Sequence, residues 1–267
     1  MNTLIDKLAL DATKIKIIAV VFMAIDHIYQ MFGPMGAPIW LTWLGRPVMV
    51  LFLFAMTVSF EHTGNRRKLM TRLLIAAWFM VICNNLLQYW LLPNGDINLI
   101  NSAFFTMFIA GLYMLFWEII VEGVRAKQVG KVVGGVLLCI LPVITVFPVI
   151  WIANLSTLPF GLHLTLFTLV KMLPCVLLVE GGYMMVGLGV MMYIVRRWRW
   201  AQVGVLAATS LAVFVFFDSQ VAQWLMVFAA IPILLYNKEK GRGMKYFFYI
   251  FYPAHVYLLY VIATLWK

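Results

Sequence analysis

The chain alternates long, nearly unbroken apolar runs with short polar or basic turns. Runs of about 17–25 apolar residues are long enough to cross a bilayer as α-helices, whose backbone groups bond internally. The pattern therefore predicts an all-α, polytopic membrane bundle of about nine transmembrane helices, organised as a single domain over 1–267. The expected spans are 15–32, 40–60, 70–92, 102–122, 131–152, 176–195, 201–217, 221–236 and 246–265.

The segment 153–175 is apolar but is interrupted by Pro159, His163, Lys171 and Pro174. Prolines and an intramembrane cation disfavour a regular spanning helix. We therefore expect this segment to be re-entrant or interfacial.

Composition excludes several other classes of protein. Hydrophobic residues make up 64% of the 267-residue chain, charged residues 11%, and the mean hydropathy is +0.97. A soluble domain is about half apolar and about a quarter charged, so a water-soluble globule and a disordered chain are both excluded. The apolar runs do not alternate with polar residues, which excludes a transmembrane β-barrel. The three cysteines lie far apart with no CxxC spacing, so no metal site is indicated.

The distribution of positive charge predicts the topology. The net charge is +10, and basic residues gather on the cytoplasmic side of membrane proteins. A cytoplasmic N-terminus and nine crossings place 17 of the 20 basic residues inside, facing anionic lipid, so the charge needs no nucleic-acid partner. A tenth crossing at 153–175 would move two basic clusters outside. The inside residues are Lys7, Lys14, Lys16, Arg66, Arg67, Lys68, Arg72, Arg125, Lys127, Lys131, Arg196, Arg197, Arg199, Lys238, Lys240, Arg242 and Lys245.

Four ionisable residues are expected at similar depth inside the bilayer: Asp26 and His27 in the first span, Arg46 in the second and His255 in the last. Such residues cost about 2.5–3.5 kcal/mol each at mid-bilayer and usually serve a function. We expect Asp26 and Arg46 to neutralise each other and the two histidines to carry protons. The alternatives are a purely structural ion pair and a hydrogen-bonded core histidine.

Other polar residues are candidates for ligand contacts. Arg66, Arg67 and Arg72 could hold the phosphates of an anionic ligand, although a topology signal explains the same cluster and no phosphate-binding glycine motif accompanies it. Asn98, Asn101, Glu180 and Tyr252 are candidate substrate contacts. The alternatives are that Asn101-Ser102 caps a helix and that Glu180 is solvated at the headgroups.

Three blocks resemble the TraX family, the membrane-embedded pilin acetylases of F-type conjugation systems. They are KIIAVVFMAIDHI, LGRPVMVLFLFAMTVSFEHTGNRRKLMTRLL and FYPAHVYLL, and the resemblance extends from about residue 14 to 262. One departure is Glu180-Gly181-Gly182-Tyr183, where the family has an Asp-Tyr-Gly turn. Lys16 and His27 also have the eleven-residue spacing of a basic residue and a histidine in membrane acyltransferases of the third type.

The resemblance implies acetyl transfer from cytoplasmic acetyl-CoA to the N-terminal amine of a pilin subunit, in the inner membrane of a bacterium. It implies that His27 is the general base or an acetylated nucleophile, that Arg46 pairs with Asp26 or stabilises the oxyanion, and that His255 carries or orients a proton. The nucleotide would lie near Lys14, Lys16 and the Arg66–Arg72 cluster.

Other activities stay open at this stage. The wider superfamily acetylates hydroxyl groups of surface glycans. A proton-coupled transporter or flippase would also bury Asp, Arg and His, although the two halves of the chain show no internal repeat. A structural assembly partner needs no such ionisable cluster.

Overall fold

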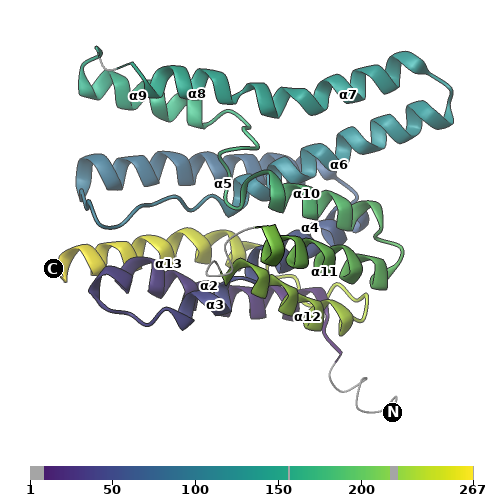
Figure 1. The fold of residues 1–267 in the computed structure, drawn as a ribbon, viewed down its shortest axis with the longest axis horizontal. Helices are drawn as coiled ribbons and strands as arrows, with labels where there is room; N and C mark the ends of the chain where they lie inside the picture. The colour runs from purple at the N-terminus through teal and green to yellow at the C-terminus, as the bar shows by residue number, and fades with distance from the viewer. Residues whose placement is uncertain (1–8, 156, 217–221, 267) are drawn as a thin grey trace. The chain divides into compact units, whose positions relative to one another are not determined.

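The structure, a computed structural model, describes residues 9–155, 157–216 and 222–266. These residues are 77% helical and contain no strand (Figure 1). An isolated parallel bridge joins Leu10 to Tyr236. The all-α fold expected from the apolar runs is confirmed. Lys7, one of the basic residues expected inside, lies outside the described residues.

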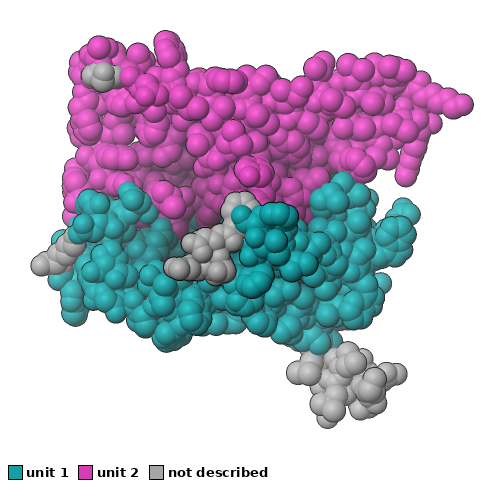
Figure 2. Space-filling model, viewed as in Figure 1, with its two compact units in different colours: residues 1–62, 94–98, 191–267 teal, residues 63–93, 99–190 magenta. Residues whose placement is uncertain are grey.

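The described helices form two compact units, coloured separately in Figure 2. Unit 1 comprises residues 1–62, 94–98 and 191–267, and unit 2 comprises 63–93 and 99–190. The organisation of both as one domain stays a prediction. The helices of unit 1 are α2 (Ala12–Phe32), η1 (Gly33–Met35), α3 (Trp40–Gly45), α4 (Val48–His62), α11 (Arg199–Phe216), η3 (Ala222–Ala229), α12 (Ala230–Leu234) and α13 (Lys245–Leu265). Those of unit 2 are α5 (Arg66–Leu86), η2 (Leu87–Leu91), α6 (Ala103–Arg125), α7 (Val129–Ile144), α8 (Val146–Ala153) and α9 (Phe160–Lys171), and α10 (Gly182–Ile194) begins there.

Seven helical segments of the described chain are long and apolar enough to cross a membrane, so the expected count of nine is not confirmed. The two expected spans that fall short are 176–195 and 221–236. They correspond to α10, with 13 residues, and to the stretch Ala222–Leu234. A 13-residue α-helix is about 20 Å long, whereas the hydrocarbon core is about 30 Å thick. The seven segments are Ala12–Met35, Trp40–His62, Arg66–Leu91, Ala103–Arg125, Val129–Ala153, Arg199–Phe216 and Tyr246–Leu265.

The segment expected to be interfacial contains α9, which has 12 residues and is also too short to span at about 18 Å. Its placement in a membrane stays a prediction. The outer surface of unit 2 is apolar on α7, which exposes Val133, Leu137 and Leu141. In a membrane, lipid chains would cover these side chains.

In unit 1 the first and last spanning helices, α2 and α13, run in the same direction. Near their N-termini, the Lys16 ammonium lies 5.9 Å from the ring centroid of Phe248. Further along, His27 of α2 contacts His255 of α13. The two candidate spans α2 and α13 are therefore parallel neighbours within unit 1.

The second span is interrupted where α3 ends at Gly45 and α4 begins at Val48. Pro47 has no backbone N–H and breaks the hydrogen-bond ladder at this point. Arg46 therefore lies at a break between two helical segments, a place where a side chain can reach neighbouring helices.

Candidate active site

Two buried histidines from α2 and α13 form a hydrogen bond. His27 Nδ1 lies 2.7 Å from His255 Nε2, and the rings stack with centroids 4.9 Å apart and planes inclined by 14°. His27 is 3% exposed and His255 9%. Residues separated by 228 positions in sequence thus meet in the interior of unit 1.

The second nitrogen of His255 fixes the protonation pattern of the neutral pair. His255 Nδ1 lies 2.7 Å from the backbone oxygen of Phe251, and a carbonyl oxygen can only accept, so Nδ1 carries the proton. His255 Nε2 is then an acceptor, and His27 Nδ1 must donate to it. It follows that His27 Nε2 carries no proton in this state and is the basic nitrogen of the pair.

Aromatic rings surround the two imidazoles. The ring of Phe251 stacks on His255 with centroids 4.7 Å apart, and the ring of Tyr252 lies 6.1 Å from that of His27. Tyr252 is buried, with 4% of its surface exposed. Its expected contact with substrate stays a prediction, and the structure adds that it packs against the histidine pair.

A second buried polar cluster contains Asp26 and Arg46, joined through a side chain that the sequence analysis did not single out. Thr42 forms a side-chain hydrogen bond with Asp26, and Arg46 Nη2 donates to Thr42 Oγ1 at 2.5 Å. Arg46 Nη1 also donates to Gln223 Oε1 at 3.2 Å. Arg46 is close enough to Asp26 to interact electrostatically, but its buried Nε has no hydrogen-bond partner among the residues that the structure describes. The expected neutralising pair is therefore bridged by a hydroxyl group.

Gly45 allows α3 to approach Asp26 closely. A Cβ atom built on Gly45 would overlap the side chain of Asp26, its carboxyl carbon included. Glycine at this position is therefore a steric requirement of the cluster, because any side chain would displace the carboxyl group that Thr42 binds.

Asp26 and His27 belong to different clusters although they are neighbours in sequence. Successive side chains on an α-helix point about 100° apart. Accordingly, His27 meets α13 and Asp26 meets α3. Asp26 and His27 thus have separate partners, and the four ionisable residues form two clusters on adjoining sides of α2.

A comparison with protein-family models matches the TraX protein family over residues 11–263. The chain belongs to the TraX family. A search of curated proteins found no match, and a search of solved structures found none. Membership links the chain to conjugation and to the modification of pilin. The matched residues include both clusters and confirm the family resemblance identified from the three sequence blocks.

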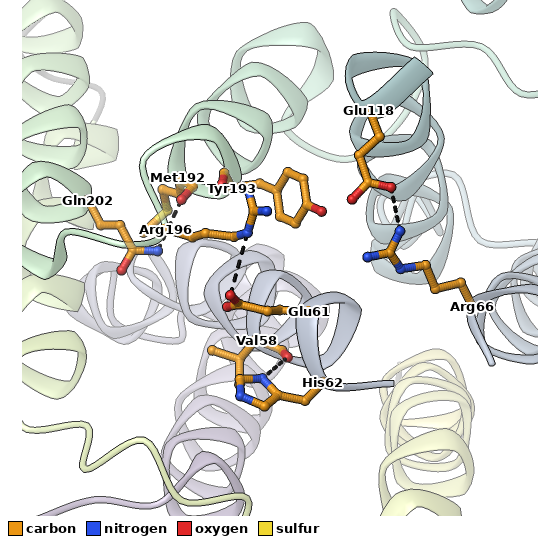
Figure 3. Close-up of polar contacts among 9 residues, drawn as sticks. All are labelled: Val58, Glu61, His62, Arg66, Glu118, Met192, Tyr193, Arg196 and Gln202. Carbon is orange, nitrogen blue, oxygen red and sulfur yellow. Dashed lines mark hydrogen bonds and ion pairs between the residues drawn. The ribbon is translucent and has the colours of Figure 1, made fainter. Parts of the chain in front are cut away.

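The expected anion-binding residues of this TraX-family chain fall in both units. Lys14 and Lys16 are on the first turns of α2 in unit 1. In unit 2, Arg66 forms an ion pair with Glu118, drawn in Figure 3, and Arg72 Nε donates to the backbone oxygen of Lys68 at 3.1 Å. Arg67 is exposed on the first turn of α5. A phosphate would therefore compete with Glu118 for Arg66.

In unit 2, Glu180 and Ser102 cap each other. The Ser102 backbone N–H donates to Glu180 Oε2 at 3.1 Å, and the Glu180 backbone N–H donates to Ser102 Oγ at 2.9 Å. The Thr106 hydroxyl donates to the Glu180 backbone oxygen at 3.0 Å. Ser102 is the N-cap of α6, and its own side chain makes no capping hydrogen bond to the first turn of the helix as described. The carboxylate at this end of the helix comes from Glu180, 78 residues away in sequence.

The two asparagines expected to contact substrate accept hydrogen bonds through their backbone oxygens. Within unit 2, Asn101 is 3% exposed and its carbonyl accepts from Asn84 Nδ2 at 3.1 Å. Within unit 1, the Asn98 carbonyl accepts from Gln30 Nε2 at 3.2 Å. Their roles toward a substrate stay predictions.

A further ion pair in unit 1 links the end of α4 to the segment after α10. Arg196 Nε lies 3.7 Å from Glu61 Oε1, and its guanidinium carbon lies 4.1 Å from the ring centroid of Tyr193 (Figure 3). His62 beside it bonds the Val58 backbone oxygen at 2.9 Å and is exposed. This arrangement anchors Arg196 and leaves His62 outside both buried clusters.

Proposed function

We propose that this TraX-family chain is an integral membrane acetyltransferase that moves an acetyl group from cytoplasmic acetyl-CoA to the N-terminal amine of a pilin subunit. The hydrogen bond between His27 and His255 carries the proposal. A buried imidazole whose basic nitrogen is fixed by a second imidazole is suited to general-base catalysis. Family membership supplies the link to pilin.

In the proposed reaction, His27 Nε2 removes a proton from the acceptor amine as its nitrogen attacks the thioester carbonyl. A C–N bond forms, the C–S bond breaks, and the leaving CoA thiolate takes the proton from His27. The positive charge that develops on His27 is stabilised through Nδ1 by His255, whose other nitrogen donates to the Phe251 carbonyl. No metal is needed for this step, and a covalent acetyl-histidine is the variant mechanism.

Arg46 is the proposed electrostatic partner of the reaction centre. Its buried Nε has no hydrogen-bond partner in the described chain, whereas its Nη atoms are held by Thr42 and Gln223. A guanidinium held on one side presents a donor that can receive a developing negative charge. The oxyanion that develops on the thioester carbonyl oxygen would fit this role.

We further propose an inner-membrane location with a cytoplasmic N-terminus. The parallel course of α2 and α13 and the basic residues at both N-termini support one common inner side. A donor entering from that side and an acceptor from the other would meet at the histidines.

The test is the intact mass of pilin from cells that express His27→Ala in place of the parent protein. We expect the acetylated mass to disappear, because general-base catalysis contributes about 10²–10⁴-fold to such rates. His62→Ala is the matched control and should retain acetylation. Normal acetylation by a membrane-inserted His27→Ala protein would remove His27 from the mechanism. Unchanged pilin with an acetyl group missing from surface glycan would point instead to O-acetylation, and substrate uptake without acetyl transfer would point to a transporter.

A further inference from the structure

The loop that precedes α13 is held against the N-terminus of α2 by backbone hydrogen bonds. The Leu10 N–H donates to the Leu235 oxygen at 2.8 Å, the Asn237 N–H to the Leu10 oxygen at 2.9 Å, and the Ala12 N–H to the Glu239 oxygen at 2.9 Å. These bonds fix residues 237–242 beside the first turn of α2. The loop is therefore anchored to the rest of unit 1 by backbone hydrogen bonds.

Side chains reinforce this attachment at two points. Thr13 Oγ1 lies 2.7 Å from the Arg242 backbone oxygen and 3.2 Å from that of Lys240. Gly241 has φ +68°, and a Cβ atom there would overlap the Asp11 carboxyl group. Asp11 in turn caps α2 by accepting from the Lys14 N–H at 2.8 Å.

These hydrogen bonds bring together two distant segments that each carry basic residues. Lys16 of α2 lies close enough to Lys240 of the loop for the two charges to repel each other. Lys14 and Arg242 are neighbours of these residues on the same two segments, and the Lys14 ammonium donates to the Ala9 backbone oxygen at 3.5 Å. Over the described residues, none of these four side chains forms an ion pair with a carboxylate. The nearby carboxylates are already engaged: Asp11 caps α2, and Glu239 Oε2 accepts from Asn237 Nδ2 at 2.9 Å.

Like charges held together without a counter-charge favour the binding of an anion. The geometry points to a phosphate-binding site formed by Lys14, Lys16, Lys240 and Arg242, which we name the basic cradle. Under the proposed function, on which this inference rests, its ligand is the diphosphate-bearing nucleotide of acetyl-CoA. Lys16 and His27 are 11 residues apart on one helix, or about 16 Å, so an extended thioester arm would connect the cradle to the histidines.

The family resemblance implied a nucleotide near Lys14 and Lys16 but not near Lys240 or Arg242. Their contribution could not be read from the sequence, since they lie more than 220 positions from Lys14 and Lys16 and their loop has the composition of an ordinary topology signal. The hydrogen bonds of Thr13 connect the two segments.

The experiment compares the purified full-length parent with the double variant Lys240→Gln/Arg242→Gln. Thermal unfolding is followed during titration with CoA, and in parallel with pantetheine, which lacks the nucleotide and its phosphates. Arg125→Gln/Arg197→Gln, which removes two exposed arginines outside the cradle, is the matched control. A third arm tests whether a lipid headgroup supplies the phosphate. It compares thermal unfolding of the parent and the double variant in phosphatidylcholine vesicles and in phosphatidylglycerol vesicles.

We expect CoA to stabilise the parent more than pantetheine does, and the double variant to bind CoA at least tenfold more weakly while its response to pantetheine is unchanged. In acetylation assays its KM for acetyl-CoA should rise by a similar factor with little change in kcat. The single variant Lys240→Gln gives the same comparison if the double variant does not insert.

The outcomes separate the cradle from the proposed function. If CoA does not stabilise the parent protein, the acetyl-CoA donor is wrong and the cradle fails with it. If CoA binds the parent and the double variant equally, the cradle is wrong and the proposed function stands. If phosphatidylglycerol stabilises the parent but not the double variant, and CoA affinity is unchanged, the phosphate belongs to lipid and the cofactor assignment is overturned.

Discussion

The close approach of Gly45 to Asp26 allows a single methyl group to test the buried carboxylate cluster. In Gly45→Ala, the added Cβ overlaps the Asp26 side chain, so either the α3 backbone or the carboxyl group must move. Movement of the carboxyl group weakens its hydrogen bond with Thr42. Since Thr42 also accepts a hydrogen bond from Arg46, that bond is weakened as well. The change should therefore reduce both stability and acetyl transfer.

The magnitude follows from three terms. Overpacking a buried site costs about 1–3 kcal/mol, and loss of a hydrogen bond to a charged group costs about 1.5–3 kcal/mol. Replacing glycine by alanine in a helix gains about 1 kcal/mol. The net expectation is destabilisation by about 1.5–5 kcal/mol, equivalent to a Tm about 3–20 °C lower for a chain of this size.

The assay is thermal unfolding of detergent-purified protein, followed by the pilin acetylation rate. Gly204→Ala in α11 is the matched control, because a Cβ built there has no heavy atom within 4 Å, and its Tm should stay level or rise. In an Asp26→Gly background the Gly45→Ala change should cost much less, since the Cβ and the carboxyl group that it would overlap are both absent. A Gly45→Ala protein as stable and active as the parent would refute the account of this cluster.

Three further substitutions examine individual hydrogen bonds. Thr42→Val keeps the side-chain shape but removes the hydroxyl that joins Asp26 to Arg46, and we expect a loss of about 1.5–3 kcal/mol in unfolding free energy and a lower kcat; unchanged kcat would separate this cluster from catalysis. His255→Phe preserves ring stacking but removes the acceptor for His27 Nδ1, and should lower kcat about 10²-fold at unchanged acetyl-CoA KM, whereas parental kcat would exclude a role in orienting His27. Glu180→Ala leaves the Ser102 N–H without its carboxylate and should cost about 1–3 kcal/mol of stability. A raised acceptor KM at parental stability would instead assign Glu180 to substrate binding.

Hydropathy was sufficient to predict the all-helical fold, and the rarity of ionisable residues in apolar runs identified His27, Asp26, Arg46 and His255. Both signals are strong because burial of charge in lipid is costly. The two short helices were predicted as spans because apolar composition does not reveal where a helix ends. Residue 221 falls outside the described residues, but the helical stretch that follows it is 13 residues long.

The roles of the bridging residues Thr42 and Gln223 could not be predicted from the sequence for a different reason. Thr42 and Gln223 are polar residues of common types, and nothing in their own surroundings distinguishes them. Their roles arise from the helix break at Pro47, which places Arg46 between them. The reciprocal bonds of Glu180 and Ser102 likewise depend on a contact across 78 positions.

The two faces of α2 keep the proposed general base, His27, apart from the carboxylate of Asp26. A histidine that gains a proton in a low-dielectric interior needs a nearby group to share the positive charge, and a carboxylate in the same helix would trap that proton if it faced the same way. Because Asp26 is turned toward Thr42 and Gly45, its negative charge is balanced by Arg46 rather than by the imidazole. In the proposed reaction, His27 is left with a neutral partner, His255, which would stabilise the proton transiently and allow its release to the leaving thiolate.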